Sequence, residues 1–104
     1  MKLDQATIAR LAEHLENAEL QAHDVVKITD EHPDMDWDDA YAIQAEILRR
    51  KLARGNRVVG LKAGLTSHAK MKQMGVETPC FGFLVDYFSV PDGGEIKTSE
   101  LIHP

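Results

Sequence analysis

The spacing of apolar residues changes near Gly55, and this change constrains the fold more than any other feature. Over residues 3–20, apolar side chains recur every three or four positions, as on one face of an α-helix: they are Ile8, Leu11, Ala12, Leu15, Ala18 and Leu20. Beyond Gly55, the apolar runs are short, rich in valine and aromatic residues, and interrupted by glycine and proline, which is typical of strands and turns. The sequence therefore predicts an α+β fold in a single amino-terminal domain, helical over residues 1–55 and mixed over residues 56–104.

A second helix is predicted from Asp36 to Arg54. Asp36 precedes an acidic first turn, which favours a helix start, and Gly55 suits the position just after a helix end. The predicted apolar stripe comprises Trp37, Ala40, Tyr41, Gln44, Ile47, Leu48 and Leu52. Basic residues crowd the last turns: Arg49, Arg50, Lys51 and Arg54. Because cations stabilise the carboxyl end of a helix dipole, we interpret them as helix-stabilising rather than ligand-binding.

In the second half of the chain, the sequence predicts shorter helices and strands. "RVVGLKAG" (57–64) and "CFGFLVDYFSV" (80–90) have strand composition. Between them, "LTSHAKMKQMG" (65–75) predicts a short helix, capped by Thr66 or Ser67 and closed by Gly75. "PDGG" (91–94) predicts a turn, and "EIKTSELIHP" (95–104) is expected to begin a further strand.

Composition excludes several classes of protein. The 104 residues are 43% hydrophobic and 28% charged, which suits one globular domain. The net charge is −5 and the 12 basic residues are scattered, which argues against a nucleic-acid surface. No apolar run approaches the roughly 20 residues that span a membrane, and no secretion signal opens the chain. Cys80 is the only cysteine, so we expect no internal disulfide and a cytoplasmic location.

Lys62 is the first candidate for chemistry. It lies in an apolar strand between Gly60 and Gly64, where a missing side chain lets a ligand approach the backbone. A lysine in such a place can hold a carboxylate, polarise a carbonyl, or act as an acid or base. The simpler alternative is an ordinary strand lysine whose ammonium reaches solvent.

Other candidate groups give weaker indications. Thr66 and Ser67 suit a helix cap, and the amides at a helix start also attract anions. The histidines have no spacing typical of a metal site, alone or with Cys80: they are His14, His23, His32, His68 and His103. The acidic stretch over residues 29–39 does not match a calcium-binding loop. The residues alone therefore predict no metal site.

Several stretches together resemble a known family. They are "HLENAELQAHDVVKIT", "DMDWDDAYAIQAEILRRKLARGNRVVGLKAGLTS", "AKMKQMGVETPCFGFLVDYFSVPDGG" and "LIHP". Over essentially the whole chain they are similar to the amino-terminal part of the 4-oxalocrotonate decarboxylases. With the 2-hydroxypentadienoate hydratases, these enzymes belong to the fumarylacetoacetate hydrolase-like superfamily. "GLKAGLTS" resembles both groups, whereas "KMKQMGVETP" and "FGFLVDYFSVPDGG" favour the decarboxylases.

The resemblance implies a reaction and a set of site residues. It implies decarboxylation of 2-oxohex-3-enedioate to 2-hydroxypenta-2,4-dienoate in the meta-cleavage pathway of aromatic catabolism. It also implies Mg²⁺ or Mn²⁺, chelated by the 1-carboxylate and 2-oxo group of this small dicarboxylic substrate. Lys62 matches the catalytic lysine of the family. The substrate-binding positions implied are Leu65, Thr66, Ser67, Gly82 and Phe83.

One departure from the family affects the expected activity. The metal-binding acids of the family follow the position that matches "LIHP", at Pro104. We therefore expect the 104 residues to be an amino-terminal portion with no metal ligands, inactive alone. The family also implies association with the hydratase, and unpaired sheet edges predict a homo-oligomer. Two alternatives stay open: a 2-hydroxypentadienoate hydratase, or a non-catalytic interaction module.

Overall fold

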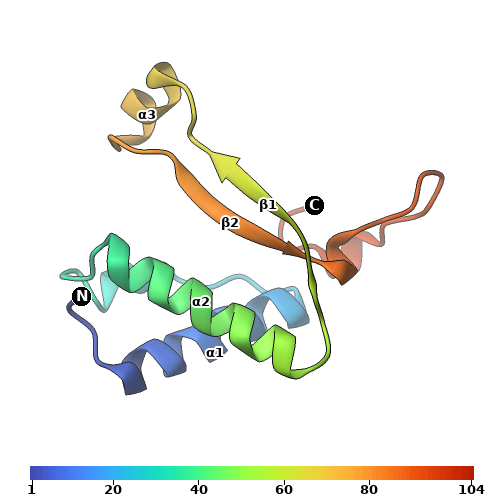
Figure 1. Ribbon diagram of the computed structural model, residues 1–104, viewed down its shortest axis with the longest axis horizontal. Coiled ribbons are helices and arrows are strands. Elements are labelled where there is room, and N and C mark those ends of the chain that lie inside the picture. Colours follow the sequence, from blue (N-terminus) through green and yellow to red (C-terminus); the bar gives the residue numbers. More distant parts are fainter. The chain divides into compact units, whose positions relative to one another are not determined.

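The computed structural model describes residues 1–104 and contains three α-helices and one two-stranded antiparallel sheet (Figure 1). The chain divides into two compact units. One unit comprises residues 1–54 together with residues 90–104, and the other comprises residues 55–89. The first unit holds helices α1 and α2, and the second holds strands β1 and β2 with helix α3 between them. The predicted α+β class is confirmed.

Helix α1 (Gln5–Gln21) and helix α2 (Trp37–Ala53) begin at aspartates, because a carboxylate can accept the unpaired N–H groups of a first turn. The Asp4 carboxylate accepts a hydrogen bond of 2.9 Å from the N–H of Thr7. Asp36 accepts one of 2.9 Å from the N–H of Asp39, and the Asp39 carboxylate accepts one of 3.0 Å from the N–H of Asp36. This reciprocal capping box confirms the predicted start of the second helix.

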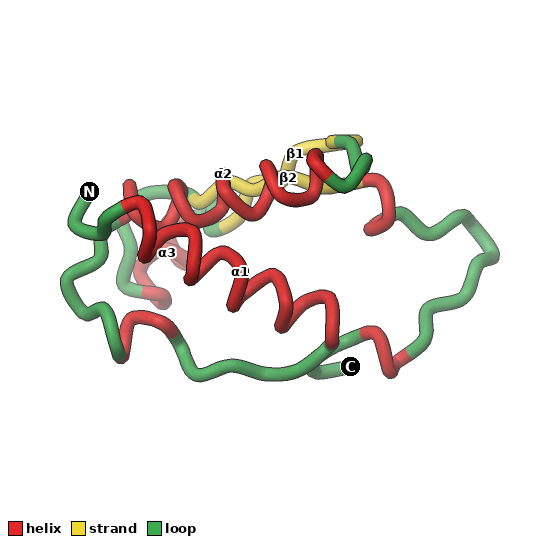
Figure 2. The backbone as a smooth tube through the Cα atoms, turned by 90° about the horizontal axis from the view of Figure 1, so that it is seen from below, coloured by secondary structure: helices red, strands yellow, loops and turns green.

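The two helices lie side by side, as Figure 2 also shows, and run in the same direction, as the colours of Figure 1 show. At their amino ends, the N–H groups of Lys2 and Leu3 donate to the Asp39 carboxylate at 3.0 Å. At their carboxyl ends, Glu16 of α1 contacts Arg50 of α2. A parallel pair requires the connecting segment to return the length of a helix, and residues 22–36 do so.

The apolar core of this unit is small. Its buried members are Ile8, Leu11, Ala12 and Ile43. The stripe predicted for α2 was misplaced, because it omitted Ile43 and included Trp37 and Leu52, which are each 47% exposed. The fully buried positions of α2 are Asp39, Ile43 and Lys51, and two of these three are charged. A hydrophobic pattern cannot locate a buried face that carries charges.

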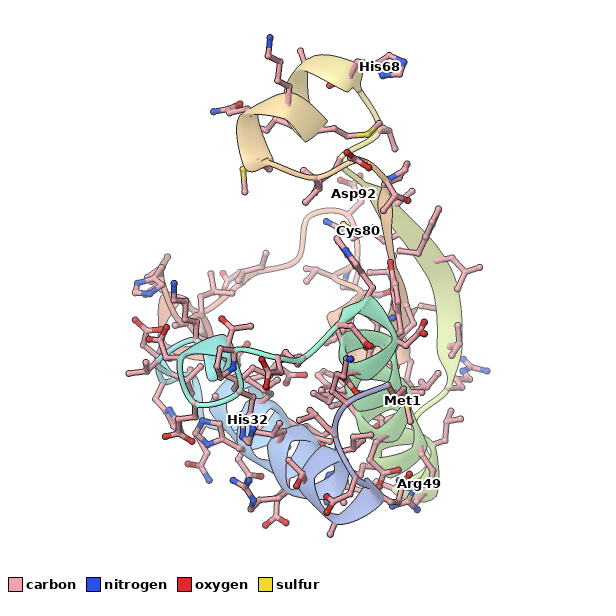
Figure 3. The ribbon with its side chains drawn as sticks, turned by 90° about the vertical axis from the view of Figure 1, so that its left-hand side faces the viewer. Met1, His32, Arg49, His68, Cys80 and Asp92 are labelled. Carbon is pink, nitrogen blue, oxygen red and sulfur yellow. The ribbon has the colours of Figure 1, made fainter.

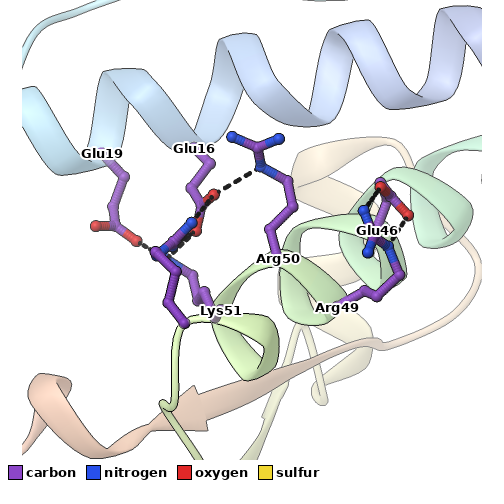
Figure 4. A network of polar contacts seen from close by, with 7 residues as sticks. Glu16, Glu19, Glu46, Arg49, Arg50 and Lys51 are labelled. Carbon is purple, nitrogen blue, oxygen red and sulfur yellow. Dashed lines mark hydrogen bonds and ion pairs between the residues drawn. The ribbon is translucent and has the colours of Figure 1, made fainter.

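A buried carboxylate joins the carboxyl ends of the two helices (Figure 4). Glu16 is 1% exposed, and its oxygens accept from Arg50 Nε at 2.9 Å and pair with Lys51 Nζ at 3.0 Å. The Arg54 guanidinium also donates to both oxygens of Glu16. Lys51 is itself 1% exposed and donates to Glu19 at 2.6 Å. Three of the four basic residues that we interpreted as dipole-stabilising, Arg50, Lys51 and Arg54, therefore hold α2 against α1.

Burial by itself raises the pKa of Glu16, because it removes the charged carboxylate from water. The hydrogen bonds from Arg54, Lys51 and Arg50 outweigh burial and lower the pKa to about 2. Burial likewise raises the pKa of Asp39. The hydrogen bonds from the N–H groups of Asp36, Leu3 and Lys2 outweigh burial and lower this pKa to about 2. Both carboxylates are therefore charged in the folded protein at neutral pH.

The second unit is a hairpin with a helix between its strands. Strands β1 (Val58–Gly64) and β2 (Cys80–Val85) pair antiparallel. Helix α3 (His68–Met74) begins at Ser67, whose hydroxyl accepts from the N–H of Lys70, and ends at Gly75, which has a φ of 71°. Both strands and the short helix were predicted, but the strand expected over residues 80–90 ends at Val85, and Asp86–Phe88 forms a 3₁₀ turn.

The turn over residues 91–94 is confirmed, since the N–H of Gly94 donates to the carbonyl of Pro91 at 2.8 Å. The strand expected from residue 95 was wrong. Thr98–Glu100 forms a 3₁₀ turn instead, and the remaining residues of this segment have no regular structure. A short extended segment needs a neighbouring strand, and the sheet contains only β1 and β2.

The substitution Glu16→Gln is expected to lower the free energy of unfolding by about 3–5 kcal/mol, because it removes the buried negative charge that Arg50, Lys51 and Arg54 share. Urea denaturation measures the change. Arg49→Ala is the control, since Arg49 pairs with Glu46 at the surface and exposed pairs contribute about 0–1 kcal/mol. Equal losses from the two substitutions would contradict the role given to Glu16.

Acid is expected to destabilise the helical unit in a defined window. The folded-state pKa values of Glu16 and Asp39 are about 2, below their ordinary values of 4.5 and 3.8. The unfolded chain therefore takes up protons first, so stability is fully present above those ordinary values and falls as the pH drops toward 2. Thermal unfolding followed by helical circular dichroism from pH 6 to pH 2 should show this fall. A midpoint that does not change across the range would contradict it.

Candidate functional site

The register of the hairpin places two predicted site residues directly opposite each other. Lys62 of β1 pairs with Gly82 of β2, and Leu61 pairs with Phe83. Since successive residues of a strand point to opposite faces, Lys62 and Gly82 share one face while Leu61 and Phe83 share the other. The structure therefore brings Lys62 and Gly82 together, and it places Phe83 on the opposite face of the hairpin.

Lys62 is exposed and makes no hydrogen bond or ion pair among these 104 residues. Its face of the hairpin carries few side chains, because Gly60 and Gly64 flank it along β1. The other face is apolar and open: Val59 is 51%, Leu61 81% and Phe81 59% exposed. An ammonium that extends freely above bare backbone is available to a negatively charged ligand.

Leu65 stands directly after β1 in an unusual backbone conformation. Its φ is 54°, in the left-handed region that non-glycine residues seldom adopt. Such a conformation costs on the order of 1–3 kcal/mol and is often found at functional sites. Leu65 is half-buried. At Leu65 the backbone turns away from β1 toward the start of α3.

Thr66 and Ser67 are both exposed and lie between Leu65 and α3. Of the two predicted caps, Ser67 is the one observed, and its hydroxyl oxygen accepts from the N–H of Lys70 at 3.1 Å. His68 begins α3 and is exposed, as Figure 3 shows.

The 104 residues do not fit a metal ion. No group of three or more His, Cys, Asp and Glu side chains is arranged so that it could hold one. Asp39 and Asp36 are engaged in helix capping, and the Glu16 carboxylate is occupied by its three cations. Within the acidic stretch over residues 29–39, Asp36 and Asp39 therefore cap helix α2.

Sequence reasoning missed two structural features of the chain. The first is the direct pairing of Lys62 with Gly82, which no local pattern encodes. The second is the importance of Glu16, although its position four residues after Ala12 puts it on the apolar face of α1. A charged residue within an apolar stripe was the signal available for Glu16.

Comparison with known proteins links this chain to one enzyme. It is 67% identical over 102 residues to the 4-oxalocrotonate decarboxylase of Pseudomonas sp. (strain CF600), covering 98% of this chain and 39% of that protein. The chain resembles the amino-terminal part of 4-oxalocrotonate decarboxylase. It thus spans about two fifths of the length of this curated relative. No family model matches the sequence.

Two further comparisons agree. Structures of the 4-oxalocrotonate decarboxylase from Pseudomonas putida G7, complexed with magnesium and adipate or with calcium and acetate, superpose with a TM-score of 0.95 at 61% identity. They cover 97% of this chain and 38–39% of the solved chains. The 2-keto-4-pentenoate hydratase of Paraburkholderia xenovorans (strain LB400) is 42% identical, covering 89% of this chain and 35% of the hydratase. Separately, none of the helices here has the length and apolar character to cross a membrane.

Leu65→Ile is expected to destabilise the protein by about 1–2 kcal/mol, because a β-branched side chain tolerates a φ of 54° less well than leucine does. Leu65→Gly is the matched control and should cause little loss, since glycine adopts this conformation readily. Chemical denaturation of both variants measures the difference. If Leu65→Gly is the more destabilising of the two, the leucine is held by packing and the backbone strain is unimportant.

Proposed function

We propose that the protein to which these residues belong decarboxylates 2-oxohex-3-enedioate to 2-hydroxypenta-2,4-dienoate. The observation that carries this proposal is the identity to 4-oxalocrotonate decarboxylase, 67% over nearly the whole chain, against 42% to the hydratase. The 104 residues act in it as one amino-terminal domain that supplies part of the substrate site. Lys62, Leu65, Thr66, Ser67, Gly82 and Phe83 are the proposed site residues.

The chemistry requires a cation near one oxygen atom of the substrate. The departing carboxylate is attached to a methylene carbon that is joined through the alkene to the 2-oxo group. When its carbon–carbon bond breaks, the electron pair moves through the alkene to the 2-oxo oxygen, and protonation of that oxygen gives the product. A positive charge placed beside the oxygen lowers the barrier, because negative charge develops there. Lys62 supplies such a charge, because its ammonium is exposed and forms no ion pair with another side chain of the 104 residues.

We further propose that Mg²⁺ or Mn²⁺ is required and that its ligands lie in the rest of the protein. The bound magnesium and calcium of the Pseudomonas putida G7 enzyme support the requirement. This chain covers 39% of the length of the relative from Pseudomonas sp. (strain CF600), so most of such a protein lies outside the 104 residues and can supply the ligands. The 104 residues alone are then inactive.

A hydratase acting on 2-hydroxypentadienoate is the second candidate, and the 42% identity to the hydratase of Paraburkholderia xenovorans favours it over unrelated activities. A non-catalytic interaction module is a third candidate, supported by the exposed apolar face of the hairpin. The two enzymatic candidates share Lys62, whereas the interaction module does not need it.

We also propose that the protein forms a homo-oligomer, that it associates with a 2-hydroxypentadienoate hydratase, and that it is located in the cytoplasm. The apolar face formed by Val59, Leu61 and Phe81 supports self-association, because isolated hairpins are seldom stable with such a face in water. Association with the hydratase would limit the loss of an unstable dienol product.

Full-length protein carrying Lys62→Ala is expected to lose decarboxylation of 2-oxohex-3-enedioate by a factor of about 100–1,000, the usual effect of removing one electrostatic contact in the transition state. Ultraviolet absorbance of the substrate, with and without Mg²⁺, measures the rate. Lys70→Ala on α3 is the matched control, since Lys70 Nζ bonds only to Gln73 nearby, and it should retain activity.

Three results distinguish the candidates. Faster turnover of 2-hydroxypentadienoate than of 2-oxohex-3-enedioate by the wild-type protein would favour the hydratase. No turnover of either compound would favour the interaction module. Decarboxylation that survives Lys62→Ala would contradict the role given to this lysine.

A further inference from the structure

The two units of the chain carry net charges of opposite sign. Residues 55–89 contain four basic and two acidic residues, whereas the rest of the chain contains eight basic and fifteen acidic residues. Over residues 55–76 there is no acidic residue at all. Surfaces of opposite charge steer two molecules toward each other and fix which faces meet. A chain that carries both signs in separate units therefore has the charges needed to attract other copies of itself.

Helix α3 is an unpartnered helix within the basic unit. It joins the far ends of β1 and β2, none of its residues is buried, and Met74 is 57% exposed (Figure 1). Lys70 Nζ donates to Gln73 at 3.2 Å. The Lys72 side chain is exposed and forms no hydrogen bond or ion pair. The helix thus offers a free cation together with exposed apolar surface.

The helical unit has carboxylates that lack a cation. In the segment between α1 and α2, Asp30 pairs with Lys27 at 3.6 Å. Glu31 and Asp34 are exposed, and neither forms an ion pair within the chain. Their negative charges are therefore available to a partner.

Glu31 and Asp34 also line an open hollow of about 600 Å³. Its lining includes the apolar side chains of Leu3, Pro33 and Met35, and also Lys2. A lysine side chain suits such a place, because its methylene groups pack on apolar atoms while its ammonium lies beside carboxylates. We call this feature the acidic hollow.

We propose that α3 of one copy of the protein docks on the acidic hollow of a second copy, with Lys72 beside Glu31 and Asp34. The proposal rests on the homo-oligomer proposed above and names its contact surfaces. A second copy is the occupant because the unpaired cation and the unpaired carboxylates belong to the same chain. The two surfaces differ, so each copy both gives and receives α3, and such head-to-tail contacts close into a ring when the rotation between copies allows it.

Sedimentation velocity of the full-length protein tests the contact. Lys72→Glu and Asp34→Lys should each weaken association at least tenfold, because a repulsive pair replaces an attractive one. The chain that carries both substitutions should regain most of the association, since the charges are then exchanged. Raising the NaCl concentration from about 50 mM to about 500 mM should weaken the wild-type assembly, because salt screens exposed charges.

Lys97→Glu is the matched control. Lys97 is exposed, forms no ion pair and lies outside α3, and the substitution changes the net charge by the same amount as Lys72→Glu. It should leave association unchanged. Circular dichroism of each variant detects misfolding, and recovery in the doubly substituted chain cannot arise from a misfolded protein.

A wild-type monomer, an assembly that does not respond to Lys72→Glu, or a doubly substituted chain that fails to reassociate would each overturn the proposal. Turnover of 2-oxohex-3-enedioate by the same samples separates this outcome from that of the proposed function. Turnover with no change in assembly leaves the function standing and removes this contact. Assembly that is lost in each single variant and regained in the double variant, without any turnover, keeps the contact and removes the decarboxylase.

Discussion

The helical unit depends on a buried carboxylate. Glu16 is surrounded by Arg50, Lys51 and Arg54, and it is stable inside the protein only because these cations compensate its charge. The contact specifies which turns of α1 and α2 meet, and hence that the helices run in parallel. Asp39 performs the same task at the other end through the N–H groups of Lys2 and Leu3. Polar contacts thus fix the register of a core that has few apolar members.

The hairpin has a different basis. Its register follows from the pairing of β1 with β2, and that pairing sets Lys62 opposite Gly82. At the base of the hairpin, Asn56 donates to Asp86 at 3.0 Å, and the N–H of Asp86 donates to the carbonyl of Arg57 at 3.0 Å. These hydrogen bonds close the base of the hairpin.

Local signals made much of this structure predictable. Asp36, Ser67 and Gly75 mark helix ends because their chemistry acts on the nearest backbone groups. The buried face of α2 was not predictable from hydrophobicity, since Lys51 and Asp39 lie on it. The parallel arrangement and the pairing of Lys62 with Gly82 depend on contacts between residues distant in sequence. Family resemblance implied Lys62 and Gly82 as site residues, and only the register shows that they share a face.

The most direct test of this account is a crystal structure of the full-length protein with Mg²⁺ and trans,trans-muconate. The account predicts a carboxylate oxygen of this ligand within about 3.2 Å of Lys62 Nζ, a hydrogen-bonding distance. A ligand bound elsewhere, with Lys62 in solvent, would contradict the central claim that this hairpin forms a wall of the substrate site.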